Sequence, residues 1–390
     1  MLLFSARRSL VFIIALLPLV AFGHVDDTGE LSQERIAATC ADKANVWLSS
    51  LDPEQLELAA RPFDEGERTD WHYLNNLPPI YMRKEGLVFK SMSSEQRILA
   101  HQLLRCGLSS QGYQKATGIM ILESIGWGKL PDKGIEVAKK ISDTVGTMDA
   151  YWLAIFGDPA NDEPWQLQLE GHHLALNFTF VAGEIAVTPT FLGTRPNVIL
   201  EGEFAGWHAM GYEKDYAFQL LSSLTNDQMT QAVIAPVVAN NIFTGPERLD
   251  AFDEYQGLAG ADMTPVQQSL LWRVIEEYVN NYEHEIAAKR LAELSSDGIE
   301  KVYFAWMGET DGIDKPAYFR VHGPSVIIEF ANASNLGGRS APKTNPDGTL
   351  KRGSHDIADP NHIHSIYLNP KSSFGRDLMR QHYQTEHSTN

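Results

Sequence analysis

The stretch that decides the fold is Ala317-Tyr-Phe-Arg-Val-His-Gly-Pro-Ser-Val-Ile-Ile-Glu-Phe-Ala-Asn332, because it predicts two strands joined by a tight turn. Apolar, β-branched and aromatic residues dominate both halves, which predicts strands at Ala317 to Gly323 and Ser325 to Asn332. Such residues favour strands. Strands joined by so short a connection pair antiparallel.

Similar strand patterns recur on both sides of this hairpin. They cover Lys301 to Gly308 and His362 to Leu368, and earlier Tyr151 to Gly157 and Trp165 to Phe180. Between these strand patterns, apolar residues recur at helical spacing in Tyr212 to Leu224, Thr225 to Ala239 and Pro265 to Leu294. The last of these is the longest helical stretch. Runs of strands joined by short turns predict an α+β fold with a mostly antiparallel sheet and a long helix.

The first third of the chain is mostly helical in pattern. Helical periods cover residues 32–51, 94–108 and 111–124, and Ser93 with Gln96 fits a capping box at the start of the second of these. From these patterns we predict a helical region at 24–148 that packs on the sheet, and an α+β region at 149–390. A signal peptide is predicted before them, at residues 1–23. The helical region and the α+β region are expected to form one continuous globular unit.

Residues 1–23 have the composition of a secretory signal. Arg7 and Arg8 precede an apolar stretch, and Ala21-Phe22-Gly23 fits a cleavage site. This stretch is expected to be a signal and not a membrane anchor, because Pro18 interrupts it and it is shorter than a spanning helix needs. No later segment is long and apolar enough to span a membrane, so we expect a periplasmic or secreted protein without stable membrane insertion once the signal is removed.

The charge of the chain argues against a nucleic-acid partner. The net charge is −18, and loss of a segment with two arginines and no acid takes it to about −20. A polyanion would be repelled, whereas a metal ion or another small ligand suits this sign.

The two cysteines, Cys40 and Cys106, predict one disulfide. Both follow the signal, no CxxC pair is present, and an exported protein meets oxidising conditions. In the entropy model a bond across so long a loop stabilises the folded state by about 4 kcal/mol.

Two short histidine clusters are the candidate functional residues. Glu170-Gly-His172-His173 and His362-Ile-His364 both have strand character. Because side chains alternate along a strand, Glu170 and His172 should share one face of their strand, and His173 should point to the opposite face. His362 and His364 should likewise share one face of theirs. If the two strands meet, their imidazoles form a site for zinc, copper or iron.

Two residues of the hairpin complete the candidate site. Glu329 would face His362 and His364 from a neighbouring strand, with Cβ atoms about 5 Å apart, as a carboxylate ligand. Arg320 could clamp a carboxylate substrate through its planar guanidinium group. The alternative is that these histidines bind only backbone or carboxylate groups inside a sheet, and that Arg320 forms a structural ion pair.

Other histidines carry weaker hypotheses. Cleavage after Gly23 would make His24 the amino terminus, where its amine and ring could bind copper. His382 and His387 lie five apart in an amphipathic stretch and are expected at the surface. Residues 335–355 lack periodicity and predict a long loop directly before His362.

Several segments resemble one family. They are Tyr151-Trp-Leu-Ala-Ile-Phe-Gly, Glu170-Gly-His-His-Leu-Ala-Leu-Asn177, Thr188-Pro-Thr-Phe-Leu-Gly193, Phe304-Ala-Trp through Arg320-Val-His-Gly-Pro324, and Asn361-His-Ile-His-Ser-Ile-Tyr followed by Phe374-Gly-Arg-Asp377. The chain is similar here to the bacterial and fungal family known as domain of unknown function 3500. The resemblance covers most of the mature chain and implies no reaction.

The residues therefore support three hypotheses. The first is an exported metal-dependent hydrolase in which His172, His173, Glu329, His362 and His364 hold the metal while Glu170 and Arg320 act in catalysis. The second is a copper or iron oxidoreductase with the same ligands. The third is a non-catalytic protein that binds a small ligand in a histidine-rich cleft.

Overall fold

A computed structural model describes residues 33–74, 85–128, 147–333, 345–346, 349 and 359–386. The described residues all belong to one compact unit. The boundary predicted between residues 148 and 149 stays a prediction. The predicted signal peptide, His24, His387 and almost all of the predicted loop at residues 335–355 lie outside the described residues.

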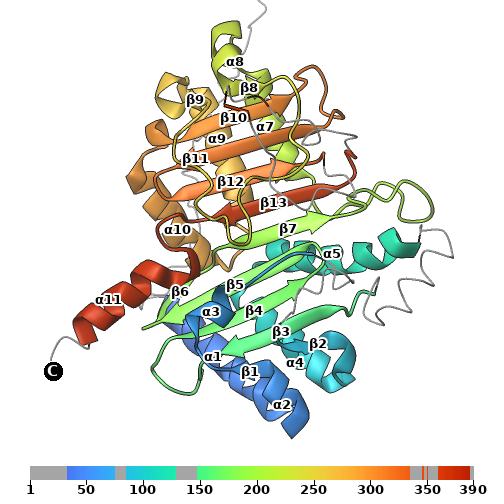
Figure 1. Cartoon of the computed structure of the whole chain (residues 1–390), viewed down its shortest axis with the longest axis vertical. Coiled ribbons are helices and arrows are strands. Elements are labelled where there is room, and N and C mark those ends of the chain that lie inside the picture. The colour runs from blue at the N-terminus through green and yellow to red at the C-terminus, as the bar shows by residue number, and fades with distance from the viewer. Residues whose placement is uncertain are drawn as a thin grey trace, which may run out of the picture. The chain divides into compact units, whose positions relative to one another are not determined.

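Runs of helices and runs of strands follow one another along the described chain, as in an α+β fold (Figure 1). The helices are α1 (Gln33–Ser49), α2 (Pro53–Ala59), α3 (Glu65–Thr69), α4 (Ser94–Gly107), α5 (Ser110–Gly128), α7 (Tyr212–Ser222), α8 (Asn226–Ala232), α9 (Pro265–Val279), α10 (His284–Asp297) and α11 (Arg376–Glu386). Short 3-10 helices are η1 (Phe89–Ser91), η2 (Gly260–Asp262), η3 (Ile299–Lys301) and η4 (Ser373–Gly375).

The described residues form one 13-stranded sheet, which is mostly antiparallel as the sequence predicts. Its strands are β1 (Ala60–Arg61), β2 (Leu87–Val88), β3 (Tyr151–Phe156), β4 (Trp165–Gly171), β5 (Leu174–Val181), β6 (Glu184–Ala186), β7 (Thr190–Thr194), β8 (Val233–Ala235), β9 (Leu258–Ala259), β10 (Tyr303–Gly308), β11 (Ala317–Gly323), β12 (Val326–Ala331) and β13 (Ile363–Leu368). The main order is β1-β3-β4-β5-β7-β13-β12-β11-β10-β8. Parallel pairing occurs for β1 with β3 and for β8 with β10.

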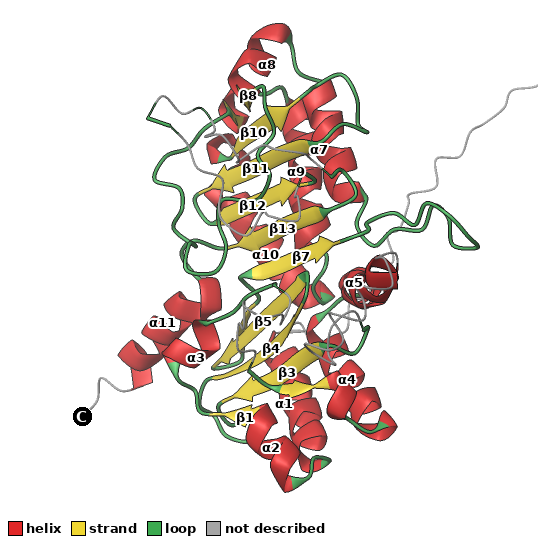
Figure 2. Cartoon of the chain, turned by 45° about the vertical axis from the view of Figure 1, so that its right-hand side comes forward, coloured by secondary structure: helices red, strands yellow, loops and turns green. Residues whose placement is uncertain are grey.

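The two faces of the sheet are covered differently. Helices α7, α9 and α10 lie behind β10 to β13 (Figure 1), and the large core contains buried side chains from these helices and from α1, α4 and α5. A smaller core on the other face is formed with Trp71, Tyr73, Ala239 and Ile242, which lie in connecting segments. Green loops cross this face in Figure 2. Side chains that point to this face meet mainly connecting segments. The short helix α3 also contacts this face, because Gln166 and Gln168 of β4 form hydrogen bonds with its Arg68.

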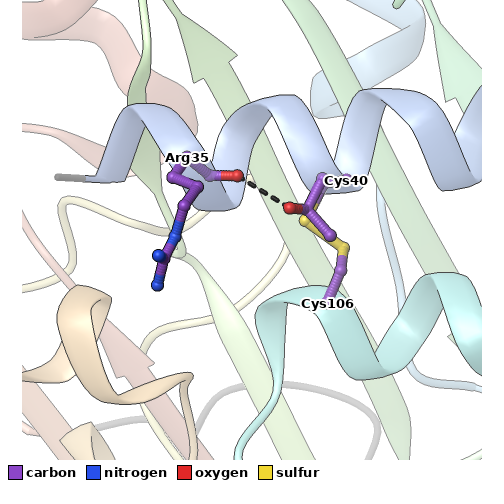
Figure 3. Close-up of a disulfide and its surroundings, with 4 residues drawn as sticks. Arg35, Cys40 and Cys106 are labelled. Atoms are coloured by element: carbon purple, nitrogen blue, oxygen red, sulfur yellow. Dashed lines mark hydrogen bonds between the residues drawn. A yellow bond between two sulfur atoms is a disulfide. The ribbon is translucent and has the colours of Figure 1, made fainter. Parts of the chain in front are cut away.

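The predicted cap and disulfide are both present. Ser93 caps α4 and forms a reciprocal capping box with Gln96. Cys40 of α1 and Cys106 of α4 are joined by a disulfide (Figure 3). The bond fastens two helices that pack side by side on the sheet. Among the described residues, no helix is both long and apolar enough to cross a membrane.

Two helix predictions need correction. The stretch from Pro265 to Leu294 is not one long helix, because α9 ends at Val279 and α10 begins at His284. At this break the amide of Glu283 donates to the carbonyl of Gly107, so the chain turns to meet another element. The helix predicted to Ala239 ends at Ala232, because the next residues pair with β10 as strand β8.

The sheet narrows to a joint between β5 and β7. These strands pair only at Leu174 with Leu192 and at Ala175 with Phe191. The residues just before Leu174 are His172 and His173, and β7 continues into its pairing with β13, where His364 lies opposite Gly193. The joint therefore brings the two histidine clusters close together in the middle of the sheet.

Candidate metal centre

His172 and His173 form the turn between β4 and β5, and not part of a strand as predicted. Gly171 pairs with Leu174 across the hairpin, which leaves the two histidines as a two-residue connection. His173 has φ 65°, a left-handed conformation in which histidine is enriched among non-glycine residues. The alternation argument fails here: the two imidazole rings stack with centroids 3.7 Å apart, and do not face opposite sides.

Hydrogen bonds fix this turn in place. The hydroxyl of Tyr151 donates to the carbonyl of His172 at 3.0 Å, and the amide of Gly193 donates to the carbonyl of His173 at 2.7 Å. The amide of His173 donates to the carbonyl of Tyr73 at 3.0 Å. Gly193 is required for this approach, because a Cβ there would lie 2.7 Å from the carbonyl oxygen of Ile363 and 3.2 Å from the His173 ring.

His364 is the second element of the centre and lies on β13 between two small neighbours. Its cross-strand partners are Gly193 on β7 and Ala331 on β12. Small residues on both sides leave room above the sheet for the His173 ring, whose centroid is 5.3 Å from that of His364. His362 precedes the strand by one residue, and its ring centroid is 4.7 Å from that of His364.

His173, His362 and His364 form one potential ligand group. One ligand atom from each lies within 4.8 Å of those of the others. The Nε2 atoms of His173 and His362 are 2.9 Å apart, and all three residues are buried. A tetrahedral zinc site with Zn–N bonds of about 2.0–2.1 Å separates its ligand nitrogens by about 3.3 Å, so a small opening of this pair would admit an ion.

Asn241 holds the ring of His364. Its Oδ1 atom lies 2.7 Å from Nδ1 of His364. An amide oxygen only accepts hydrogen bonds, so this contact selects the tautomer that has its proton on Nδ1 and its metal-binding lone pair on Nε2. Outer groups of this kind orient metal-binding histidines in many sites.

The electrostatics keep these rings neutral. Burial, with the neighbouring His172, lowers the pKa of His364 to about 3. Burial and then the surrounding histidines hold the pKa of His173 well below its usual range. Neutral imidazole is the form that binds metals, so both rings are ready to bind an ion at neutral pH.

Glu123, His172 and His173 form a second potential ligand group that shares His173 with the first. Both carboxylate oxygens of Glu123 lie 2.7 Å from Nδ1 of His172. The sequence interpretation missed Glu123, which comes from α5. Its signal is a single acid that directly follows the apolar run from Ile119 to Leu122.

Glu329 lies in neither ligand group: its cross-strand partner on β13 is Ile366 and not a histidine, and other groups bind its carboxylate. The amides of Phe243 and Thr244 donate to it at 2.8 Å each, and the hydroxyl of Tyr318 donates at 2.7 Å. The hydroxyl of Thr244 donates as well. Four donors use the acceptor sites of this carboxylate and hold it in the sheet.

Glu170 and Arg320, the predicted catalytic residues, are both buried. Glu170 accepts a hydrogen bond from the amide of His72 at 3.3 Å and lies in neither ligand group. Arg320 donates to Oε1 of Gln256 at 3.0 Å, and its guanidinium carbon lies 3.9 Å from the centroid of the Phe252 ring. The catalytic roles of both residues stay predictions.

Two further residues differ from what the sequence suggested. His382 of α11 is buried and not at the surface as predicted, because this helix packs against the molecule through η4 and β5. Asn241 was not predicted at all, since it lies in a connecting segment without a motif. Only the tertiary structure places its side chain on His364.

Comparison with known proteins gives one match. Residues 33–376 match the model of a family described as "Protein of unknown function (DUF3500)". No curated protein and no solved structure matches the chain. The match agrees with the resemblance seen in the histidine-bearing segments.

Proposed function

Because the chain belongs to the DUF3500 family, whose description assigns no activity, we propose a function from the site itself: a metal-dependent hydrolase. The observation that carries the proposal is the group of three buried imidazoles, His173, His362 and His364. Three histidines with an open fourth position form one of the ligand sets of catalytic zinc.

The protein would supply position and charge to this centre. His173 is fixed by its turn and His364 by Asn241, so two of the ligands are held before any ion binds. A bound ion would supply Lewis acidity and lower the pKa of a coordinated water. The acidic surface of the chain favours the approach of a cation.

We further propose that the protein is exported to the periplasm or secreted. The Cys40–Cys106 disulfide supports this proposal, because disulfides persist mainly in oxidising compartments. Amino-terminal sequencing of the mature protein checks it. A sequence that begins at Met1 would contradict export through cleavage near Gly23.

Elemental analysis of protein purified without a polyhistidine tag is the first test. We expect at least one zinc ion per chain, less metal in His362→Ala and His364→Ala, and unchanged metal in His208→Ala, an exposed histidine in neither ligand group. Ester, amide and phosphoester substrates should be hydrolysed in a chelator-sensitive, zinc-restored manner. Stoichiometric copper or iron with redox turnover would favour an oxidoreductase, and protein that binds no ion would favour a small-ligand-binding protein.

A further inference from the structure

His173 faces two groups at once. Its Nε2 atom lies 2.9 Å from Nε2 of His362, on the side of the first ligand group. Its Nδ1 atom lies 3.8 Å from Oε2 of Glu123, on the other side of the ring. That Nδ1 atom is buried and has no hydrogen-bond partner among the described residues. A buried polar atom without a partner is costly, and it needs an explanation.

Glu123 and His172 supply the remaining atoms of a site around this nitrogen. One ligand atom each from Glu123, His172 and His173 lies within 4.8 Å of the others. The rings of His172 and His173 are inclined by only 27°, so both Nδ1 atoms approach the same carboxylate. Two imidazoles and one carboxylate form a ligand set of catalytic zinc and of non-haem iron.

We propose that a second metal ion binds Glu123, His172 and Nδ1 of His173, and that the His173 ring bridges it to the ion of the first group. The proposal rests on the proposed metal centre and extends it from one ion to two. Both nitrogens of His173 then coordinate, and the ring proton leaves to solvent. The negative charge of the Glu123 carboxylate and of the bridging ring offsets part of the added positive charge.

The second ion would be more exposed to solvent than the first. The side chain of His172 is 23% exposed, whereas those of Glu123 and His173 are 5% and 2% exposed. The first group, by contrast, consists of three buried histidines. Substrate would therefore approach from the side of His172, and the buried ion would polarise the shared ring.

Metal titration of the metal-stripped full chain separates one ion from two. We expect about two zinc ions per chain in the wild type and about one in Glu123→Gln and in His172→Asn, with the first group intact. Glu203→Gln, which changes an exposed acid, should keep both ions. Melting temperatures of the metal-free proteins confirm that each variant is folded.

Electron paramagnetic resonance of the copper(II)-loaded protein tests the bridge itself. Two copper ions joined by one imidazolate couple their spins, so the wild type should lose most of its low-temperature signal. Glu123→Gln should instead show the full signal of about one isolated ion. The presence or absence of spin coupling in the wild type already tests the bridge, even if the variant does not fold.

The outcomes separate the two proposals. One ion per chain in both the wild type and Glu123→Gln would overturn the second site and leave the first standing. Two ions with uncoupled spins would overturn the bridge. A wild type that binds no ion would overturn the proposed function together with this inference.

Discussion

Oδ1 of Asn241 lies 2.7 Å from Nδ1 of His364, although 123 residues separate them in sequence. The loop segment that carries Asn241 covers the face of the sheet from which His364 projects. The same side chain also accepts a hydrogen bond from the amide of Ile242, which fixes its direction. His364 is therefore positioned by a loop as well as by its strand.

Asn241→Leu should weaken zinc binding by about 10- to 100-fold, the usual effect of losing an outer partner of a metal ligand. The ring of His364 would lose the acceptor that selects its tautomer. Competition with a zinc chelator measures the affinity.

Asn241→Asp is the matched control, because it keeps an acceptor oxygen at the same place. We expect it to retain much more zinc affinity than Asn241→Leu. Equal affinities of both variants and the wild type would show that Asn241 does not position the ligand.

The disulfide between Cys40 and Cys106 spans 66 residues, so its loss should lower the free energy of unfolding by about 4 kcal/mol in the entropy model. The double variant Cys40→Ala, Cys106→Ala tests this by denaturant unfolding. Dithiothreitol should destabilise the wild type and leave the double variant unchanged. If complete reduction of the disulfide left the free energy of unfolding of the wild type unchanged, the prediction would be wrong.

Lys115 of α5 is buried between two acids, with Nζ 2.8 Å from Glu213 and 2.5 Å from Glu277. Lys115→Met should cost about 3–5 kcal/mol, because it leaves buried carboxylates without their cation. Lys289→Met is the control, since Lys289 pairs with Glu184 at an exposed site, and it should cost less than about 1 kcal/mol. Similar losses for both variants would contradict the argument from burial.

Glu277 should make stability depend on pH. Burial raises its pKa above 4.5, although Lys115 opposes this rise. As pH rises past 4.5 the unfolded chain loses this proton first, so the free energy of unfolding falls until the folded carboxyl also ionises and then stays at the lower value. Glu277→Gln should therefore gain stability relative to the wild type across this window. The free energy of unfolding of both proteins is measured from about pH 4 to about pH 8. If the difference between Glu277→Gln and the wild type stayed constant over this range, the raised pKa would be contradicted.

Replacement of Gly112 in α5 by alanine should destabilise the protein, although this substitution normally stabilises a helix. Alanine usually stabilises a helix interior by about 1 kcal/mol relative to glycine. At Gly112, however, a Cβ would lie 1.9 Å from the carbonyl oxygen of Asn281, so Gly112→Ala should be clearly destabilising. Gly118→Ala in the same helix meets its nearest atoms at 3.2 Å and should be much better tolerated. Thermal unfolding of both variants decides the sign.

Local sequence patterns predicted many elements of the fold. The strand Ala317–Gly323 has the predicted bounds, and the capping box of Ser93 and Gln96 is present. These features depend on side chains within a few residues of one another. The break between α9 and α10 was missed, because apolar spacing continues through it while the backbone turns to bind Gly107.

The candidate site was predictable in part. Its histidines were identified, but the alternation rule gave the wrong orientation to His172 and His173. A two-residue turn removes strand alternation, and its position depends on which residues of β4 and β5 pair. Glu329 was expected beside the histidines, yet loop amides and Tyr318 use its oxygens.

The sequence by itself determined the α+β class, the strand-forming segments, the disulfide partners and the two histidine clusters. Only the tertiary structure decided that the clusters meet, that Glu123 reaches His172 from a helix, and that Asn241 holds His364. The physical reason is the range of the interactions. Propensity and capping act between near neighbours, whereas the site depends on strand order and loop placement, which arise from contacts between residues far apart in the chain.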